Sequence, residues 1–305
     1  MMAFVSSAWA HPTDCRVESS RRVWCSAPNR SMAAKARTTR CVSLKMNGEA
    51  GDAPLTLPPR DYPQLYVQSL EAIRAALKEK VQFLELEFPA LRNMATSALN
   101  QIADANREHA RALATALAAD KDAGTVCLVF PDAKEAALAT KVFGESTVLP
   151  FEVGSLAAAA TMQAEREQPA GSTRTLFVVV NPGFNIEEWL QLESLHLGHP
   201  SDPILVINGG MDRVRSGYYP RLFYPKLHQT KDRFLCKFEP VFFYKPFGSG
   251  LGTLYRKFPA DWQTLFHVKD GGGYRLLSQD AQRPEYKVVE QNFRAESIAV
   301  YQKRT

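Results

Sequence analysis

The alternation of short apolar runs with helix-like segments is the strongest constraint on the fold. Five strand-sized runs lie between residues 81 and 210, and the clearest are "TVCLVF", "TLFVVV" and "ILVI". Strands that are buried on both faces have such continuous apolar sequences, because helices cover both sides of a parallel sheet. The segments between them have helical lengths and periodicity. The sequence therefore predicts an α/β fold with a doubly wound, mostly parallel, Rossmann-like sheet.

This rhythm changes at about residue 213. Turn-rich connections, without a helical pattern, separate four further strand-like runs at residues 239–247, 252–259, 262–270 and 273–280. Closely spaced strands of this kind are typical of an antiparallel meander. A last helix is expected at about 284–295. Residues 61–305 are thus predicted to form a single α/β domain with an antiparallel extension.

The first 46 residues differ in composition from the rest. They contain eight Arg or Lys, seven Ser and only two acidic residues. A composition rich in Arg and Ser and poor in acids is typical of an organelle transit peptide. We therefore expect residues 1–46 to be a disordered leader that is removed, with a disordered cytosolic tail as the alternative. The Gly- and Pro-rich residues 47–60 are interpreted as a linker.

The net charge of +5 arises in this leader, which carries +6 and leaves −1 for residues 47–305. A neutral body provides no long-range attraction to phosphates, and no RNA-recognition aromatic signature is present. Nucleic acid is therefore not an expected partner. No apolar run reaches the length of about 18 residues that a membrane-spanning helix needs, so no transmembrane segment is expected.

The most unusual part of the body is the stretch from 213 to 238, which contains seven basic residues and one acid, Asp232. Arg side chains can make bidentate contacts, and aromatic rings can anchor a partner. We interpret part of this stretch as a protein-contact surface, comprising Arg213, Arg215, Tyr218, Tyr219, Arg221 and Tyr224. The alternative is that the rings pack over the sheet while their basic neighbours face water.

A second candidate site lies at the carboxyl ends of the predicted strands, where open α/β sheets bind ligands. The residues there that form a candidate pocket for a phosphorylated small molecule or nucleotide are Asn181, Gly183, Asn208, Gly209 and Asp212. Asn, Asp and Gly also dominate ordinary turns, which is the competing interpretation.

No complete catalytic motif is present. The sequence lacks GxxxxGK[ST], GxGxxG between a strand and a helix, and GxSxG. His196 and His199 have no third metal ligand nearby, and the body has no CxxC, so no metal and no cofactor are expected. Glu85 and Glu87 share one face of a strand, which we expect to be solvated or to meet Lys or Arg from a helix. An enzymatic activity stays open, and the sequence favours a protein without one.

Several stretches resemble the plastid and cyanobacterial family DUF1995, which includes low-photosystem-II-accumulation-type chloroplast proteins. They are "YPQLYVQSLEAIRAALKEKVQFLELEFP", "VVVNPGFN", "VINGGMDRVRSGYYP" and "GTLYRKFPADWQ". The resemblance covers about residues 59–294 and supplies no catalytic residues.

The resemblance implies a chloroplast location, in the stroma or at the periphery of the thylakoid, in agreement with the leader. It also implies, for some members, a role in photosystem II assembly or accumulation. The expected function is therefore a non-enzymatic factor that contacts photosystem II assembly intermediates through the basic-aromatic surface. The alternative is an enzyme or sensor that binds a phosphorylated ligand at the strand ends.

Overall fold

A computed structural model describes residues 56–120, 124–144, 148–161, 174–183, 185–247, 250–268 and 273–302. The predicted transit peptide and most of the predicted linker lie outside these residues.

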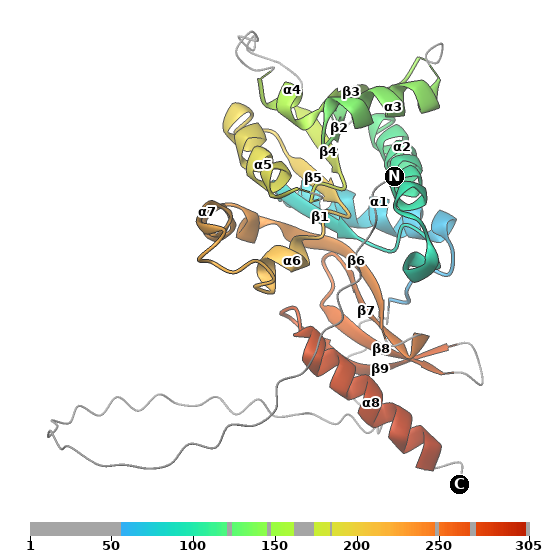
Figure 1. The fold of residues 1–305 in the computed structure, drawn as a ribbon. Coiled ribbons are helices and arrows are strands. Elements are labelled where there is room, and N and C mark those ends of the chain that lie inside the picture. The colour runs from blue at the N-terminus through green and yellow to red at the C-terminus, as the bar shows by residue number, and fades with distance from the viewer. Residues whose placement is uncertain are drawn as a thin grey trace, which may run out of the picture. The chain divides into compact units, whose positions relative to one another are not determined.

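The described strands form one nine-stranded sheet, in which the first six strands run parallel. In spatial order these are β3 (Glu152–Ser155), β2 (Thr125–Phe130), β4 (Thr175–Val180), β5 (Ile204–Ile207), β1 (Phe83–Glu87) and β6 (Glu239–Phe247). The sheet continues through the antiparallel strands β7 (Gly252–Lys257), β8 (Trp262–Val268) and β9 (Gly273–Asp280) (Figure 1). The predicted mixed fold, mostly parallel with a C-terminal meander, is confirmed.

Strand β6 joins the two parts of the sheet. It pairs with β1 in parallel on one side and with β7 in antiparallel on the other. The sequence analysis placed this run in the meander alone, because its turn-rich surroundings resemble those of the strands that follow it. In the strand-like run "STVLPFEV" at 146–153, the described residues form a strand only at the end, because β3 begins at Glu152, after Pro150.

Helices cover both faces of the parallel part. One face packs against α1 (Tyr62–Lys78), α2 (Leu99–Ala118) and α3 (Ala133–Phe143). The other face packs against α4 (Leu156–Thr161), α5 (Ile186–Gly198), α6 (Met211–Arg215) and α7 (Pro225–Arg233). Helix α8 (Tyr286–Gln302) packs on the meander through Val289 and Phe293 (Figure 1). Two short 3₁₀ helices complete the described elements, η1 (Met94–Thr96) and η4 (Leu235–Lys237).

Helices α6 and α7 correct the expectation that no helix lies between residues 213 and 238. Pro225 occupies the first turn of α7, where proline is well tolerated. Of its nine residues, the buried ones are Leu227, His228 and Thr230. With one buried apolar residue in about two turns, the sequence has no hydrophobic periodicity from which this helix could be predicted.

Candidate functional site

The most exposed apolar side chains of the basic-aromatic stretch lie in the aromatic loop, which we define as residues 216–224 between α6 and α7. Tyr218, Leu222 and Phe223 are 71%, 85% and 72% exposed. Arg221 lies among them with a side chain that is 73% exposed, and its guanidinium is 3.6 Å from a carboxylate oxygen of Asp232. Large apolar side chains on neighbouring surface positions are typical of contact sites. The loop therefore has the composition and exposure of a contact surface.

Ring packing around Tyr219 connects the aromatic loop to the core of the domain. The ring of Tyr219 lies 5.0 Å from that of Tyr218, 5.3 Å from that of Tyr224 and 5.6 Å from that of the fully buried Trp189. His228 Nε2 donates a hydrogen bond of 2.7 Å to the carbonyl of Tyr219. Edge-to-face ring pairs fix relative orientation. The loop thus presents its outer side chains on a rigid base, which lowers the entropy cost of binding.

Two residues assigned to the contact surface also have partners inside the fold. Arg213 donates a hydrogen bond of 2.8 Å to the carbonyl of Gly183, and its guanidinium lies 5.3 Å from the Trp189 ring. Arg215 Nη1 lies 2.6 Å from the Oε2 atom of Glu85. Arg215 is only partly exposed, whereas Arg213 stays exposed despite these contacts, so the outward-facing part of the predicted surface is Arg213, Tyr218, Arg221 and Tyr224. Sequence reasoning did not include Leu222 or Phe223, although apolar residues beside Pro and Arg in a non-periodic segment are a usable signal.

Asn181 and Asn208 follow β4 and β5 in left-handed backbone conformations, with φ of 47° and 52°. Asn adopts this region more readily than most residues. The Oδ1 atom of Asn208 accepts a hydrogen bond of 2.8 Å from the N–H of Phe88, and its Nδ2 donates one of 2.7 Å to Asn106. The Asn208 side chain is therefore used in joining β5, β1 and α2.

The two strand-end glycines make room for Trp189. The indole Nε1 of Trp189 donates a hydrogen bond of 3.1 Å to the carbonyl of Gly209. Gly183 has φ of +135°, and a Cβ atom there would lie 2.7 Å from the Trp189 ring and 2.7 Å from the Gly209 oxygen. A side chain of α5 therefore occupies the space beside these two glycines.

Replacing Gly183 by Ala is accordingly expected to destabilise the protein by about 3 kcal/mol, because backbone strain and overpacking each contribute. Urea denaturation followed by circular dichroism measures this effect. Gly154→Ala is the matched control, since a Cβ atom at Gly154 meets nothing within 4 Å. Equal stability of the two variants would contradict the role given to Gly183.

A cavity of about 390 Å³ lies where the chain leaves β2 and β4 toward opposite faces of the sheet. Such a switch point is the expected place for a ligand, and Asn181 lines it. The described residues of its wall include three carboxylates and no Lys or Arg; the carboxylates belong to Asp132, Glu135 and Glu188. Asp132 caps α3 through hydrogen bonds to the N–H groups of Lys134 and Glu135. An acidic wall does not favour a phosphorylated ligand.

The remaining predicted pocket residue, Asp212, belongs instead to a cluster of charges between β1, α6 and the start of α8. Its carboxylate receives a hydrogen bond of 2.6 Å from Arg283 and another from Tyr286, and Lys245 Nζ lies 3.6 Å away. Glu85 and Glu87 face the same region from β1. The structure thus separates Asn181 from Asp212 and joins Asp212 to the carboxylate pair.

Burial is the main influence on the pKa values of Glu85 and Glu87. It raises the pKa of the Glu85 carboxyl, and the guanidinium of Arg215 opposes the rise. Burial, with the negative charges of Glu85 and Asp212, raises the pKa of Glu87 to about 7. The prediction that this strand face meets a basic residue from a helix is confirmed for Glu85. Within the described part of the chain, no group of three or more His, Cys, Asp or Glu residues is arranged to hold a metal ion.

The fold and these sites define an α/β domain with a doubly wound sheet, a C-terminal meander and no nucleotide-binding loop of the types sought in the sequence. The family model described as Domain of unknown function (DUF1995) matches residues 59–291, which is well over half of the chain. The chain therefore belongs to this family. A comparison with curated proteins and one with solved structures each gave no significant match. Among the described residues, no helix is both long enough and apolar enough to span a membrane.

Proposed function

We propose that this protein is a non-enzymatic chloroplast factor that assists photosystem II assembly or accumulation by binding a protein partner through the aromatic loop. The observation that carries the proposal is the exposure of Tyr218, Leu222 and Phe223 on a rigid base. Exposed aromatic anchors beside Arg are the residues that dominate binding energy at protein interfaces.

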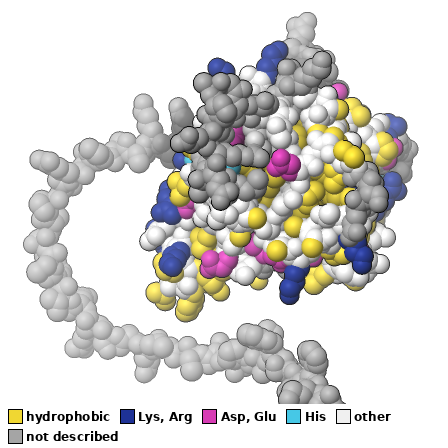
Figure 2. All heavy atoms as spheres, turned by 90° about the horizontal axis from the view of Figure 1, so that it is seen from above, with side chains coloured by type: hydrophobic (Ala, Val, Ile, Leu, Met, Phe, Trp, Pro, Cys, Tyr) yellow, Lys and Arg dark blue, Asp and Glu magenta, His cyan; other side chains and the backbone are white. Residues whose placement is uncertain are grey.

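The charges around the loop suggest the chemistry of the partner. Arg221 and Lys226 are exposed beside the apolar side chains. A partner with an apolar centre and an acidic rim would complement them. On the face shown in Figure 2, by contrast, Lys and Arg side chains lie apart from one another among hydrophobic atoms. The described side chains of that face thus form no continuous basic patch.

The chloroplast and photosystem II parts of the proposal rest on two sequence observations. Residues 1–46 have the composition of a transit peptide. The quoted stretches resemble a family that includes low-photosystem-II-accumulation-type proteins, and the family match supports that resemblance at the level of the domain.

A triple variant tests the contact surface. Tyr218→Ser, Leu222→Ser and Phe223→Ser together are expected to reduce recovery of photosystem II subunits at least about tenfold, since loss of central anchors costs several kcal/mol of binding. Recovery is measured by affinity capture of the full chain from gently solubilised plastids. Stability should change by only about 0.5 kcal/mol per substitution, because exposed positions lose little on truncation.

The matched control replaces comparably exposed side chains elsewhere, namely Leu99, Leu197 and Tyr301, by Ser. It should recover the same subunits as the natural sequence. Equal recovery by both triple variants, or recovery of no photosystem II subunit by the natural chain, would contradict the proposal. Flotation with anionic lipid vesicles provides a second readout. Vesicle binding lost only in the aromatic-loop variant would assign the loop to a lipid surface instead.

A further inference from the structure

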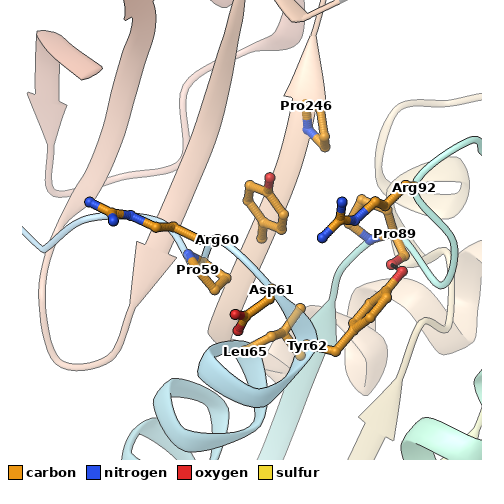
Figure 3. Close-up of a pocket in the computed structure, with 9 residues that line it drawn as sticks. Pro59, Arg60, Asp61, Tyr62, Leu65, Pro89, Arg92 and Pro246 are labelled. Atoms are coloured by element: carbon orange, nitrogen blue, oxygen red, sulfur yellow. Dashed lines mark hydrogen bonds between the residues drawn. The ribbon is translucent and has the colours of Figure 1, made fainter. Parts of the chain in front are cut away.

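A large cavity lies beside the charge cluster, at the carboxyl end of β1. Strand β1 ends at Glu87, which pairs with Phe243, so β6 projects beyond it from Tyr244 to Phe247. The chain after β1 turns back opposite this projection. Between them lies a cavity of about 700 Å³, a volume suited to a small organic ligand. A neighbouring cavity of about 190 Å³ shares Arg92 and Tyr244 with it (Figure 3).

The walls of the large cavity combine apolar surface with two cations. Phe88, Pro89, Met94 and Pro246 contribute apolar side chains, and Arg92 and Lys245 contribute the positive charges. Apolar walls with a few charged groups are the usual composition of sites that bind small molecules.

Arg92 lines both the large and the small cavity. Its side chain is exposed, and no carboxylate of the described residues lies within ion-pair distance of it. Figure 3, which shows the small cavity, has the Arg92 guanidinium directed into the space between Pro246 on β6 and Tyr62 at the start of α1, whereas Arg60 extends away. A guanidinium without a carboxylate partner can make two parallel hydrogen bonds to a carboxylate or phosphate.

Lys245 adds positive charge from the opposite wall. Its ammonium lies 3.6 Å from the Oδ2 atom of Asp212 and 4.1 Å from the centre of the Tyr286 ring. Asp212 also binds Arg283, so one carboxylate faces two cations. With Glu85 paired to Arg215, the cluster keeps one uncompensated positive charge next to the cavity while Glu87 is neutral.

Glu87 gives the site a titratable hydrogen-bonding group. Its Oε2 atom is buried and has no hydrogen-bond partner among the described residues. Burial is the main cause that raises the pKa of Glu87, followed by the charges of Glu85 on β1 and Asp212 on α6, while Lys245 on β6 and the backbone of Gly210 lower it. A neutral carboxyl at this position can donate a hydrogen bond to an anion, and an ionised one repels it.

We propose that this cavity binds a small organic anion, in which a carboxylate or phosphate group is attached to an apolar body. Arg92 and Lys245 bind the charged group, the neutral carboxyl of Glu87 donates a hydrogen bond to it, and the apolar wall receives the body. This site is separate from the aromatic loop, and its test is independent of the proposed partner binding.

Benzoate and phenyl phosphate are suitable probes, with benzyl alcohol as the uncharged control, titrated by calorimetry into the full chain. We expect both anions to bind and benzyl alcohol to bind at least about tenfold more weakly, because it lacks the charge that Arg92 recognises. The tighter of the two anions identifies a carboxylate or a phosphate ligand. The pH series uses benzoate, whose own charge is constant near neutrality. Its affinity should fall by up to about tenfold per pH unit above pH 7, since binding takes up one proton.

Three variants make the test specific. Arg92→Gln should weaken benzoate binding at least about tenfold, while Arg60→Gln, which removes the neighbouring Arg that points away, should leave it unchanged. Glu87→Gln should bind benzoate without pH dependence, because an amide donates at every pH. Absence of binding of both anions at millimolar concentration would overturn the proposal. It would also be overturned by binding that Arg92→Gln does not weaken, or by pH dependence that persists in Glu87→Gln.

Discussion

Replacing Arg215 by Ala is expected to lower the free energy of unfolding by about 3 kcal/mol, because it leaves a buried carboxylate without its partner. Glu85 is only 1% exposed and lies in the interior of the sheet, on β1 between β5 and β6. Its Oε2 atom is 2.6 Å from Arg215, and its Oε1 atom has no hydrogen-bond partner among the described residues. Urea denaturation of the natural chain and the variant measures the difference.

Two controls distinguish the loss of the Glu85–Arg215 ion pair from a general effect of removing a positive charge. Arg221→Ala removes an exposed Arg of the same stretch and should change stability by no more than about 0.5 kcal/mol. The double replacement of Glu85 and Arg215 by Met should recover most of the loss, since an apolar pair needs no compensation. A double variant as unstable as Arg215→Ala would show that the ion pair does not explain the effect.

Replacing Glu87 by Gln is expected to stabilise the protein by about 3 kcal/mol above pH 7 and to have no such effect below about pH 4. The folded protein raises the pKa of Glu87 to about 7, so it binds this proton more tightly than the unfolded chain does. Stability contributed by the protonated carboxyl is therefore complete at low pH. It falls as pH rises from the unfolded value near 4.5 toward 7, and then stays constant. A Gln side chain is neutral at every pH, so the variant does not lose this contribution to stability as pH rises.

The measurement is the difference in unfolding free energy between the Gln variant and the natural chain across this pH range. Glu290→Gln, at an exposed position of α8, is the control and should give a small difference that does not change with pH. If the difference in unfolding free energy for Glu87→Gln also did not change with pH, it would contradict the buried environment that we assign to this carboxyl.

Sequence reasoning was most effective for the strands of the parallel part. The runs at β2, β4 and β5 are apolar at almost every position, and burial on both faces requires this pattern. It failed for α6 and α7 because short helices bury few apolar residues. Strand order was also inaccessible: β1 pairs with β5 and β6, which are far from it in the chain, and local patterns contain no information on such pairing.

For the candidate sites too, local composition was predictive, whereas contacts between distant segments were not. The composition of the basic-aromatic stretch indicated a contact surface, but not which of its residues also have partners inside the fold. Arg213 and Arg215 lie on one short helix, and their partners, Gly183 and Glu85, come from distant segments. The cluster around Asp212 depends on Arg283, 71 positions later in the chain. Only the folded structure brings these charges together, so neither the cluster nor its cavity could be derived from spacing.

Photo-crosslinking from the aromatic loop tests directly whether this loop contacts photosystem II proteins. A photoreactive amino acid replaces Leu222 in the full chain, and Leu197, which is also exposed, in a matched control. Both are irradiated in intact plastids, and the crosslinked proteins are identified by mass spectrometry. We expect crosslinks to photosystem II subunits or assembly factors from position 222 and not from position 197. Identical products from both positions, or none from position 222, would contradict it.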